Sequence, residues 1–319
     1  MLQHLACTSR SVLTLLATLA VAACQSTTTP TAPTTDDPDK PNIVATSTIV
    51  ADLVAQVGGD AIDLQGLLEP GADPHVYEPV PADSIAIEQA DFVFYSGHNL
   101  EPALVDLILG AGSGVPYLAV GEQIAPLALE KEGQRVADPH VWGDVSHAIV
   151  MVEKIRDALS ELEPEQAATF ATNAAVIVAE LQRLDDWIPV QIMTIPEGQR
   201  AIVTTHDAFQ YYASAYGLEV IGTLIGISTE EQPSAQTVRS LVEAIKTAGL
   251  PAIFAETTIA PKLIETVAEE AGVKVADPKL YSDSIGAPGS AGDSYIKMMV
   301  SNTCSIAINL GGSCTPFEP

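Results

Sequence analysis

The sequence predicts an α/β protein of two lobes, each with a mainly parallel sheet flanked by helices. In both halves of the chain, short apolar runs that indicate strands alternate with helical patterns, and this alternation favours parallel strands. Between the halves, the stretch from Pro164 to about Ile195 is rich in Ala, Leu and Val and contains no glycine. It predicts one long helix of roughly 45 Å, enough to cross the molecule.

The N-terminal residues predict export and a lipid anchor. A single basic residue, Arg10, precedes a short apolar stretch at 12–23. The stretch is too short to span a bilayer, which takes roughly 20 apolar residues, but it has the length of the apolar region of a signal peptide. It ends on Val21-Ala22-Ala23-Cys24, which resembles the lipobox of bacterial lipoproteins. The resemblance implies that residues 1–23 are a signal peptide and that the Cys24 thiol is acylated. An ordinary cleaved signal with an incidental cysteine is the alternative.

Residues 24–41 are rich in Thr and Pro and include Asp36, Asp37 and Asp39. The segment lacks the apolar residues that packing requires, so we expect a solvated tether. An acylated cysteine and a tether would hold the rest of the chain outside the cytoplasm, anchored to a membrane in the periplasm or on the outer cell surface. No later apolar run is long enough to span a bilayer, so we do not expect a permease.

Residues 42–163 are predicted to form the first lobe. Its elements begin with a strand at 42–46 and a helix at 49–57. The second strand runs into a loop that contains His75, and the last strand leads towards His140. The remaining strands are expected at 62–68, 91–95 and 115–120, and the remaining helices at 81–89, 101–109 and 147–162.

Residues 164–195 are predicted to form the long helix, and residues 196–319 the second lobe. Pro164 can occupy the first turn of the long helix, whereas Pro189 should kink or end it. The alternation of strands and helices then resumes. Strands are expected at 201–205, 219–224, 252–256 and 273–276, and helices at 207–216, 234–248, 261–271 and 292–310.

The charge balance excludes some classes of partner. Acidic residues outnumber basic ones by 41 to 14, which gives a net charge of −27. Such a surface repels nucleic acid and anionic lipid and weakly attracts cations. We expect most of this charge to keep the protein soluble, so a specific site must supply any selectivity. No nucleic-acid partner is expected.

Two cysteines remain after the signal peptide and Cys24. Cys304 falls in a helical pattern that stops at Gly311-Gly312, and Cys314 follows the turn. An even pair in an oxidising compartment can form a disulfide that fixes the C-terminus, provided that the two residues meet the geometric limits on bridging.

Three of the six histidines lie in short motifs of the kind that metal sites need: His75, His140 and His206. Together with Asp283, each follows or ends an apolar run that predicts a strand. Ligands scattered along a chain converge when each lies at the tip of a strand in an α/β sheet. Three imidazoles and one carboxylate complete a four-coordinate shell for a borderline divalent cation.

Other polar residues near these motifs have different expected roles. A ligating imidazole usually donates its second N–H to a carboxylate or carbonyl, and Asp73, Asp138 and Asp207 are near enough in sequence to accept it. His98 follows a strand and could approach the cleft, and His147 lies near a helix start. We expect both to be ordinary polar residues, because a lone histidine is usually one.

The chain resembles the metal-receptor lipoproteins of bacterial ABC importers for zinc, manganese and iron, the group that includes the streptococcal adhesin-like receptors. The resemblance runs from about Asn42 to Leu310. It depends on residues 71–79 (GADPHVYEP), 138–142 (DPHVW), 205–209 (THDAF), 280–284 (LYSDS) and 292–296 (GDSYI).

This resemblance implies two lobes joined by one long rigid helix, with the metal held in the cleft between them. His75 and His140 would come from the first lobe, and His206 and Asp283 from the second. It also implies a binding protein rather than an enzyme, one that delivers its metal to an importer permease with a cytoplasmic ATPase. We expect a monomer.

The choice of metal depends on one ligand and one loop. In this family, a glutamate in place of His206 goes with manganese or iron receptors, whereas histidine resembles zinc or mixed zinc/manganese receptors. Many zinc receptors also carry a His-rich loop between the first two ligands, but residues 121–137 contain no histidine. On ligand softness we favour Zn²⁺, with Mn²⁺ next.

Two other classes of function remain open from the residues alone. A zinc-dependent hydrolase needs an open coordination position for water and a nearby base. Four protein ligands leave no such position, and the sequence contains no His-Glu-x-x-His or nucleophile-elbow motif. An adhesin or structural surface lipoprotein would not need a buried metal site at all.

Overall fold

The computed structural model describes residues 40–318, except 111–113 and 132–133. The predicted signal peptide, Cys24 and the tether up to residue 39 therefore lie outside the described residues. Among the described residues, no helix is both long and apolar enough to cross a bilayer.

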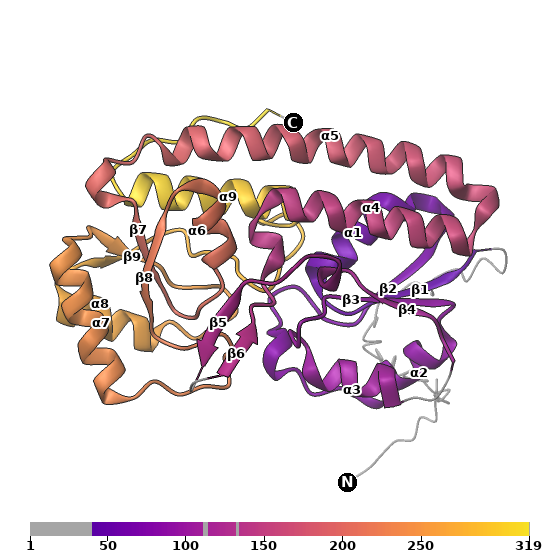
Figure 1. The fold of residues 1–319 in the computed structure, drawn as a ribbon, viewed down its shortest axis with the longest axis horizontal. Coiled ribbons are helices and arrows are strands. Elements are labelled where there is room, and N and C mark those ends of the chain that lie inside the picture. Colours follow the sequence, from indigo (N-terminus) through magenta and orange to yellow (C-terminus); the bar gives the residue numbers. More distant parts are fainter. Residues whose placement is uncertain (1–39, 111–113, 132–133, 319) are drawn as a thin grey trace, which may run out of the picture. The chain divides into compact units, whose positions relative to one another are not determined.

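The first lobe is built on a parallel sheet with the strand order β2-β1-β3-β4. Its strands are β1 (Asn42–Ala45), β2 (Asp63–Gly66), β3 (Phe92–Tyr95) and β4 (Tyr117–Ala119). Helices α2 (Pro81–Gln89) and α3 (Pro102–Gly110) cover one face of the sheet, and α1 (Thr48–Gly58) and α4 (Val145–Leu162) cover the other (Figure 1). Ile43 on the central strand pairs with Leu64 on one side and Phe92 on the other. The carboxyl ends of these strands therefore face the same edge.

A single long helix, α5 (Ala167–Ile192), runs from the first lobe to the second alongside α4 and α9 (Tyr295–Asn309) (Figure 1). Pro164 begins a 3-10 turn directly before it. Pro189 lies inside the helix, which continues only to Ile192. One face is buried at helical spacing: Phe170, Ala174, Ile177, Leu181, Leu184 and Ile188.

The second lobe contains two parallel strand pairs. These are β7 (Ala201–Thr204) with β8 (Glu219–Thr223), and β9 (Ala252–Ile253) with β10 (Lys274–Val275). A parallel bridge between Thr204 and Phe254 connects the two pairs. The helices of this lobe are α6 (Gln210–Tyr216), α7 (Ala235–Ala248) and α8 (Lys262–Ala271). The predicted α/β class with parallel sheets and a long connecting helix is confirmed.

Three local expectations were wrong. Residues expected to form only a loop contain an antiparallel pair, β5 (Ala128–Lys131) and β6 (Gln134–Ala137). The helix expected from Asp207 begins at Gln210, because the backbone N–H groups of Asp207 and Ala208 are bonded to Gly226 O and His206 O in a turn before the helix. The helix expected from residue 292 begins at Tyr295, because the Ser294 side chain caps its N-terminus.

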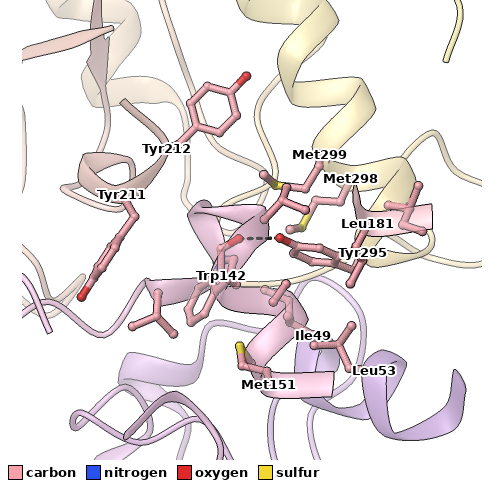
Figure 2. Close-up of a cluster of buried hydrophobic side chains, with 14 of the residues drawn as sticks. Ile49, Leu53, Trp142, Met151, Leu181, Tyr211, Tyr212, Tyr295, Met298 and Met299 are labelled. Atoms are coloured by element: carbon pink, nitrogen blue, oxygen red, sulfur yellow. Dashed lines mark hydrogen bonds between the residues drawn. The ribbon is translucent and has the colours of Figure 1, made fainter. Parts of the chain in front are cut away.

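One hydrophobic core extends across both lobes. Figure 2 shows Ile49 and Leu53 of α1 in one cluster with Trp142 and with Tyr295 of α9. The Tyr295 hydroxyl donates to Trp142 O at 2.6 Å (Figure 2). Because this core includes the turn that follows His140, it fixes one side of the cluster described below.

The C-terminal segment is bonded to the end of the long helix. Cys304 on α9 forms a disulfide with Cys314. Beyond the disulfide, Thr315 N donates to Gln191 Oε1 at 2.9 Å. The segment thus joins α9 to α5 where the long helix enters the second lobe.

Candidate metal centre

Four side chains meet between the two lobes: His75, His140, His206 and Asp283. Their potential ligand atoms all lie within 4.8 Å of one another, and all four residues are buried. His75 lies in the 3-10 turn Pro74–Val76 that follows β2. His140 directly precedes the 3-10 turn Val141–Gly143, and His206 follows β7. Asp283 follows Leu280, which is bridged to Glu256. Each predicted residue therefore lies at the end of a strand or the start of a turn, as its motif indicated.

Three of the distances between potential ligand atoms match those of a small four-coordinate site. The Nε2 atoms of His75 and His140 are 3.3 Å apart. Asp283 Oδ1 lies 3.3 Å from His140 Nε2, and Asp283 Oδ2 lies 3.2 Å from His206 Nε2. Zinc at roughly 2.0–2.1 Å from each of four tetrahedral ligands would place those ligands roughly 3.3 Å from one another. His75 Nε2 lies farther out, at 4.0 Å from Asp283 Oδ1, so the cluster must contract on the His75 side to surround one ion.

Two carboxylates orient two of the imidazoles. Asp138 Oδ1 lies 2.7 Å from His140 Nδ1 and accepts a hydrogen bond from His140 N at 3.0 Å. Glu256 accepts hydrogen bonds from the backbone N of His206, at 2.8 Å, and from its Nδ1. A ring whose Nδ1–H is donated to a carboxylate presents the Nε2 lone pair to the centre.

The predicted supporting aspartates have different roles. Asp138 contacts an imidazole as expected. Asp73 Oδ1 accepts from the backbone N of His75 at 3.0 Å, so it stabilises the turn rather than the ring. Asp207 is bonded to Gln210. The ring of His206 is held instead by Glu256, which the sequence analysis missed; the available signal was a carboxylate that ends an apolar run, 252–256.

The surroundings assign different protonation states to the three histidines in the metal-free protein. Burial lowers the pKa of His75 to about 3, so this imidazole is neutral at physiological pH. Burial opposes charge on His140 as well, but hydrogen bonds and charges from Asp138 and Asp283 outweigh it and raise the pKa to about 9.

His206 and Asp283 form a charged pair. Burial disfavours the charged form of His206, but the charges of Asp283 and Glu256 outweigh burial and raise its pKa well above the usual value. Burial likewise disfavours ionised Asp283, yet His206 and His140 hold its pKa well below the ordinary range. In the metal-free cluster, His140 and His206 are therefore protonated where a cation would bind.

The two remaining histidines of the described region do not join the cluster. His98 Nε2 lies 3.0 Å from Gly121 O and 3.3 Å from Ile124 O. Its side chain lines a cavity of about 560 Å³ that His75 also lines. His147 Nδ1 lies 3.1 Å from Val141 O. Both are bonded to backbone carbonyls.

The fold has two α/β lobes with a buried cluster of potential metal ligands between them. This arrangement defines a solute-binding receptor. The chain belongs to the family described as zinc-uptake complex component A, periplasmic, which matches residues 43–308.

Individual relatives are named for different metals. Over 260 residues, the chain is 35% identical to the manganese-binding lipoprotein MntA of Halalkalibacterium halodurans, covering 82% of this chain and 85% of that protein. It is 33% identical over 279 residues to the iron ABC transporter substrate-binding lipoprotein MtsA of Streptococcus pyogenes serotype M1, covering 85% and 89%. Its fold is similar to that of the periplasmic zinc-binding protein TroA from Treponema pallidum, with a TM-score of 0.81 and 32% identity over 85% of this chain and 99% of that one.

The family identifies the class of function. Its members are metal-binding components of ABC importers rather than enzymes. The expectation of a solute-binding protein is therefore confirmed, and the hydrolase and adhesin alternatives find no support. The names of the relatives, which include zinc, manganese and iron, leave the metal of this chain to be argued from its own residues.

Proposed function

We propose that this chain captures one divalent transition-metal ion with His75, His140, His206 and Asp283 and delivers it to an ABC-type importer. The observation that carries the proposal is the convergence of three Nε2 atoms on one buried carboxylate, at 3.2–4.0 Å from its oxygens. Nitrogen and carboxylate ligands at this spacing suit a borderline cation.

The same geometry favours transport over catalysis. Four protein ligands fill a tetrahedral shell, whereas catalytic zinc keeps a position open for water. An ion with no open coordination position is a cargo that leaves only when the ligands separate. Delivery requires a permease with its cytoplasmic ATPase as partners, and the chain acts as a monomer.

Calorimetric titration of zinc into wild type and single alanine variants tests this function. His75→Ala, His140→Ala, His206→Ala and Asp283→Ala should each weaken binding by roughly 100-fold or more, because each removes one of four ligands. His98→Ala, outside the cluster, serves as the control and should bind as wild type does. A wild-type isotherm for His206→Ala would overturn the proposed site.

We infer that Zn²⁺ is preferred over Mn²⁺. Three nitrogen ligands and one carboxylate suit zinc, whereas Mn²⁺ favours oxygen ligands and more of them. His206→Glu exchanges a nitrogen for a charged oxygen, so it should lower the ratio of zinc affinity to manganese affinity. Competition titrations measure that ratio. An unchanged or higher ratio in the variant would remove the main support for zinc.

We also propose that acylated Cys24 anchors the protein to a membrane outside the cytoplasm. The lipobox-like sequence and the relatives named as lipoproteins support this. Cys24→Ala should release the protein into the aqueous phase of a detergent partition while leaving zinc affinity unchanged, because the anchor and the site are far apart in sequence. Recovery of the variant in the detergent phase would contradict acylation at Cys24.

A further inference from the structure

The loop that carries Asp283 is hydrogen-bonded to the first lobe, although it belongs to the second lobe in sequence. Before Asp283, Trp142 Nε1 donates to Ser282 O at 3.1 Å. After Asp283, Ser284 Oγ lies 3.0 Å from Thr48 Oγ1, at the first residue of α1. First-lobe residues therefore hold the backbone on both sides of this ligand.

Two hydroxyls form the second of these connections. Ser284 Oγ accepts from Gly71 N at 2.7 Å, in the loop that leads to His75, and lies 3.0 Å from Ile285 O. Thr48 Oγ1 accepts from Ile285 N at 3.0 Å. If Thr48 donates to Ser284 and Ser284 donates to Ile285 O, both hydroxyl protons are used. Both side chains are buried, with 5% of Thr48 and 0% of Ser284 exposed, so these bonds are shielded from water.

His206 is fixed differently. Its backbone N and its Nδ1 are bonded to Glu256, and Thr204 Oγ1 donates to its carbonyl at 2.7 Å. These partners all belong to the second lobe.

The loop of Asp283 also has second-lobe partners, but they lie before Asp283: Asn302 is bonded to the backbone of Tyr281, and Thr258 Oγ1 lies 3.4 Å from Ser282 Oγ. The proposed ligands thus divide unevenly, because His206 is held by second-lobe residues alone, while the backbone on both sides of Asp283 is bonded to the lobe that carries His75 and His140.

We propose that Thr48 and Ser284 are positioning residues that latch Asp283 to the first lobe, an inference that builds on the proposed metal site. The latch assembles His75, His140 and Asp283 as a three-ligand half-site. When the lobes separate, His206 is then the ligand that parts from the other three. Holding a ligand in place before the ion arrives reduces the ordering cost of binding.

Thr48→Val and Ser284→Ala break the latch with little change of shape. Zinc competition titration on the full chain should give a dissociation constant roughly tenfold higher for each variant, because a buried partner loses its hydrogen bond. The double variant should bind no more than roughly twofold more weakly than the weaker single variant, because both changes break one bridge. Thr48→Ser keeps the hydroxyl and should restore wild-type affinity. Thr266→Val, the same change at an exposed position of α8, should bind as wild type does.

The same substitution made in the Asp283→Ala variant separates an effect on the position of Asp283 from an effect on general stability. If the latch acts through Asp283, then adding Thr48→Val to Asp283→Ala should change the zinc dissociation constant by less than roughly twofold. Ser284→Ala supplies the same comparison should Thr48→Val fail to fold, as judged by thermal unfolding of the metal-free protein.

A further tenfold loss in the Asp283→Ala background would overturn the latch, since the hydroxyls would then act independently of Asp283. Wild-type affinity for both Thr48→Val and Ser284→Ala would also overturn it. Wild-type affinity for Asp283→Ala alone is a different outcome, because it would refute the metal site itself and the latch with it.

Discussion

Two carboxylates outside the proposed shell set the direction of two histidines. Asp138 is bonded to both the backbone and the ring of His140, and Glu256 makes the same pair of contacts to His206. Each carboxylate fixes the ring plane, and its negative charge makes the imidazole a better donor to a cation. The affinity of the site should therefore depend on residues that never touch the metal.

Glu256→Gln tests that dependence. The amide can still accept one hydrogen bond from His206, but it carries no charge and brings its own N–H groups to a buried site. We expect zinc affinity to fall by roughly 10- to 100-fold, the usual cost of losing such a partner. Competition titration measures the change, and Glu265→Gln on the exposed side of α8 is the matched control. Equal affinities for Glu256→Gln and the control would contradict the role of Glu256.

Zinc affinity should rise with pH. His140, with a pKa of about 9, and His206, with a raised pKa, both carry protons at neutral pH in the metal-free protein, and zinc must displace them. Between about pH 6.5 and 9 the dissociation constant should fall by roughly tenfold per pH unit for each proton displaced. Titrations in buffers of different ionisation enthalpy count the released protons. Binding without proton release at pH 7 would contradict the assigned protonation states.

The stability of the metal-free protein should change in the opposite direction. A histidine whose pKa is higher in the folded than in the unfolded protein stabilises the fold. This stabilisation is fully present below the unfolded pKa, near 6.5. It is lost as pH rises through the folded value, which is about 9 for His140. Thermal unfolding should therefore show a lower melting temperature at pH 9 than at pH 6.5 without metal, and a smaller decrease with zinc bound. A melting temperature of the metal-free protein that rises from pH 6.5 to pH 9 would contradict this prediction.

At the scale of elements, α6 connects the second lobe to the segment before His140. The Tyr211 hydroxyl, on α6, accepts from Leu127 N at 2.8 Å and donates to Asp138 O at 3.0 Å. Asp138 in turn holds the His140 ring. One side chain of the second lobe thus restrains the backbone that presents a first-lobe histidine.

Tyr211→Phe removes both hydrogen bonds and keeps the ring. We expect the free energy of unfolding to fall by about 1–3 kcal/mol, since each such bond contributes about 0.5–1.5 kcal/mol. Zinc affinity should also fall, because the Asp138 turn becomes less restrained. Urea unfolding and titration measure the two effects. Tyr117→Phe, at an exposed tyrosine, is the control, and a Tyr211→Phe variant indistinguishable from it would refute the connection.

Sequence-based prediction succeeded where the signal lay within a single segment of the chain. Strands such as β1 and helices such as α5 were predicted because their apolar spacing is a property of the segment itself. The β5–β6 pair was missed because its charged residues do not alternate with apolar ones. Starts of helices shifted where one side chain decided them, as Ser294 does for α9.

The site shows the same division between local and non-local signals. The motifs around the four clustered residues are contiguous in sequence, so they could be recognised directly. Glu256 offered only a carboxylate at the end of an apolar run, because its role depends on two strands meeting. Thr204 pairs with Phe254 in parallel, so the residues two positions further on, His206 and Glu256, lie side by side. No pattern within either segment contains that pairing.

At the scale of the whole folded unit, the lobes share a core that α1, α4, α5 and α9 build together. Trp142 and Tyr295 are bonded inside it (Figure 2). The excess of acidic over basic residues, 41 to 14, attracts cations to the surface without selecting among them, so the buried cluster alone must select.

The central claim is that these four residues carry one metal ion as cargo. The most direct measurement is the metal content, by mass spectrometry, of the protein recovered from its native location, for wild type and His206→Ala side by side. We predict about one equivalent of zinc in wild type, the stoichiometry of a single four-ligand site, and a small fraction of that in the variant. A metal-free wild type, or equal metal content in both proteins, would contradict the claim.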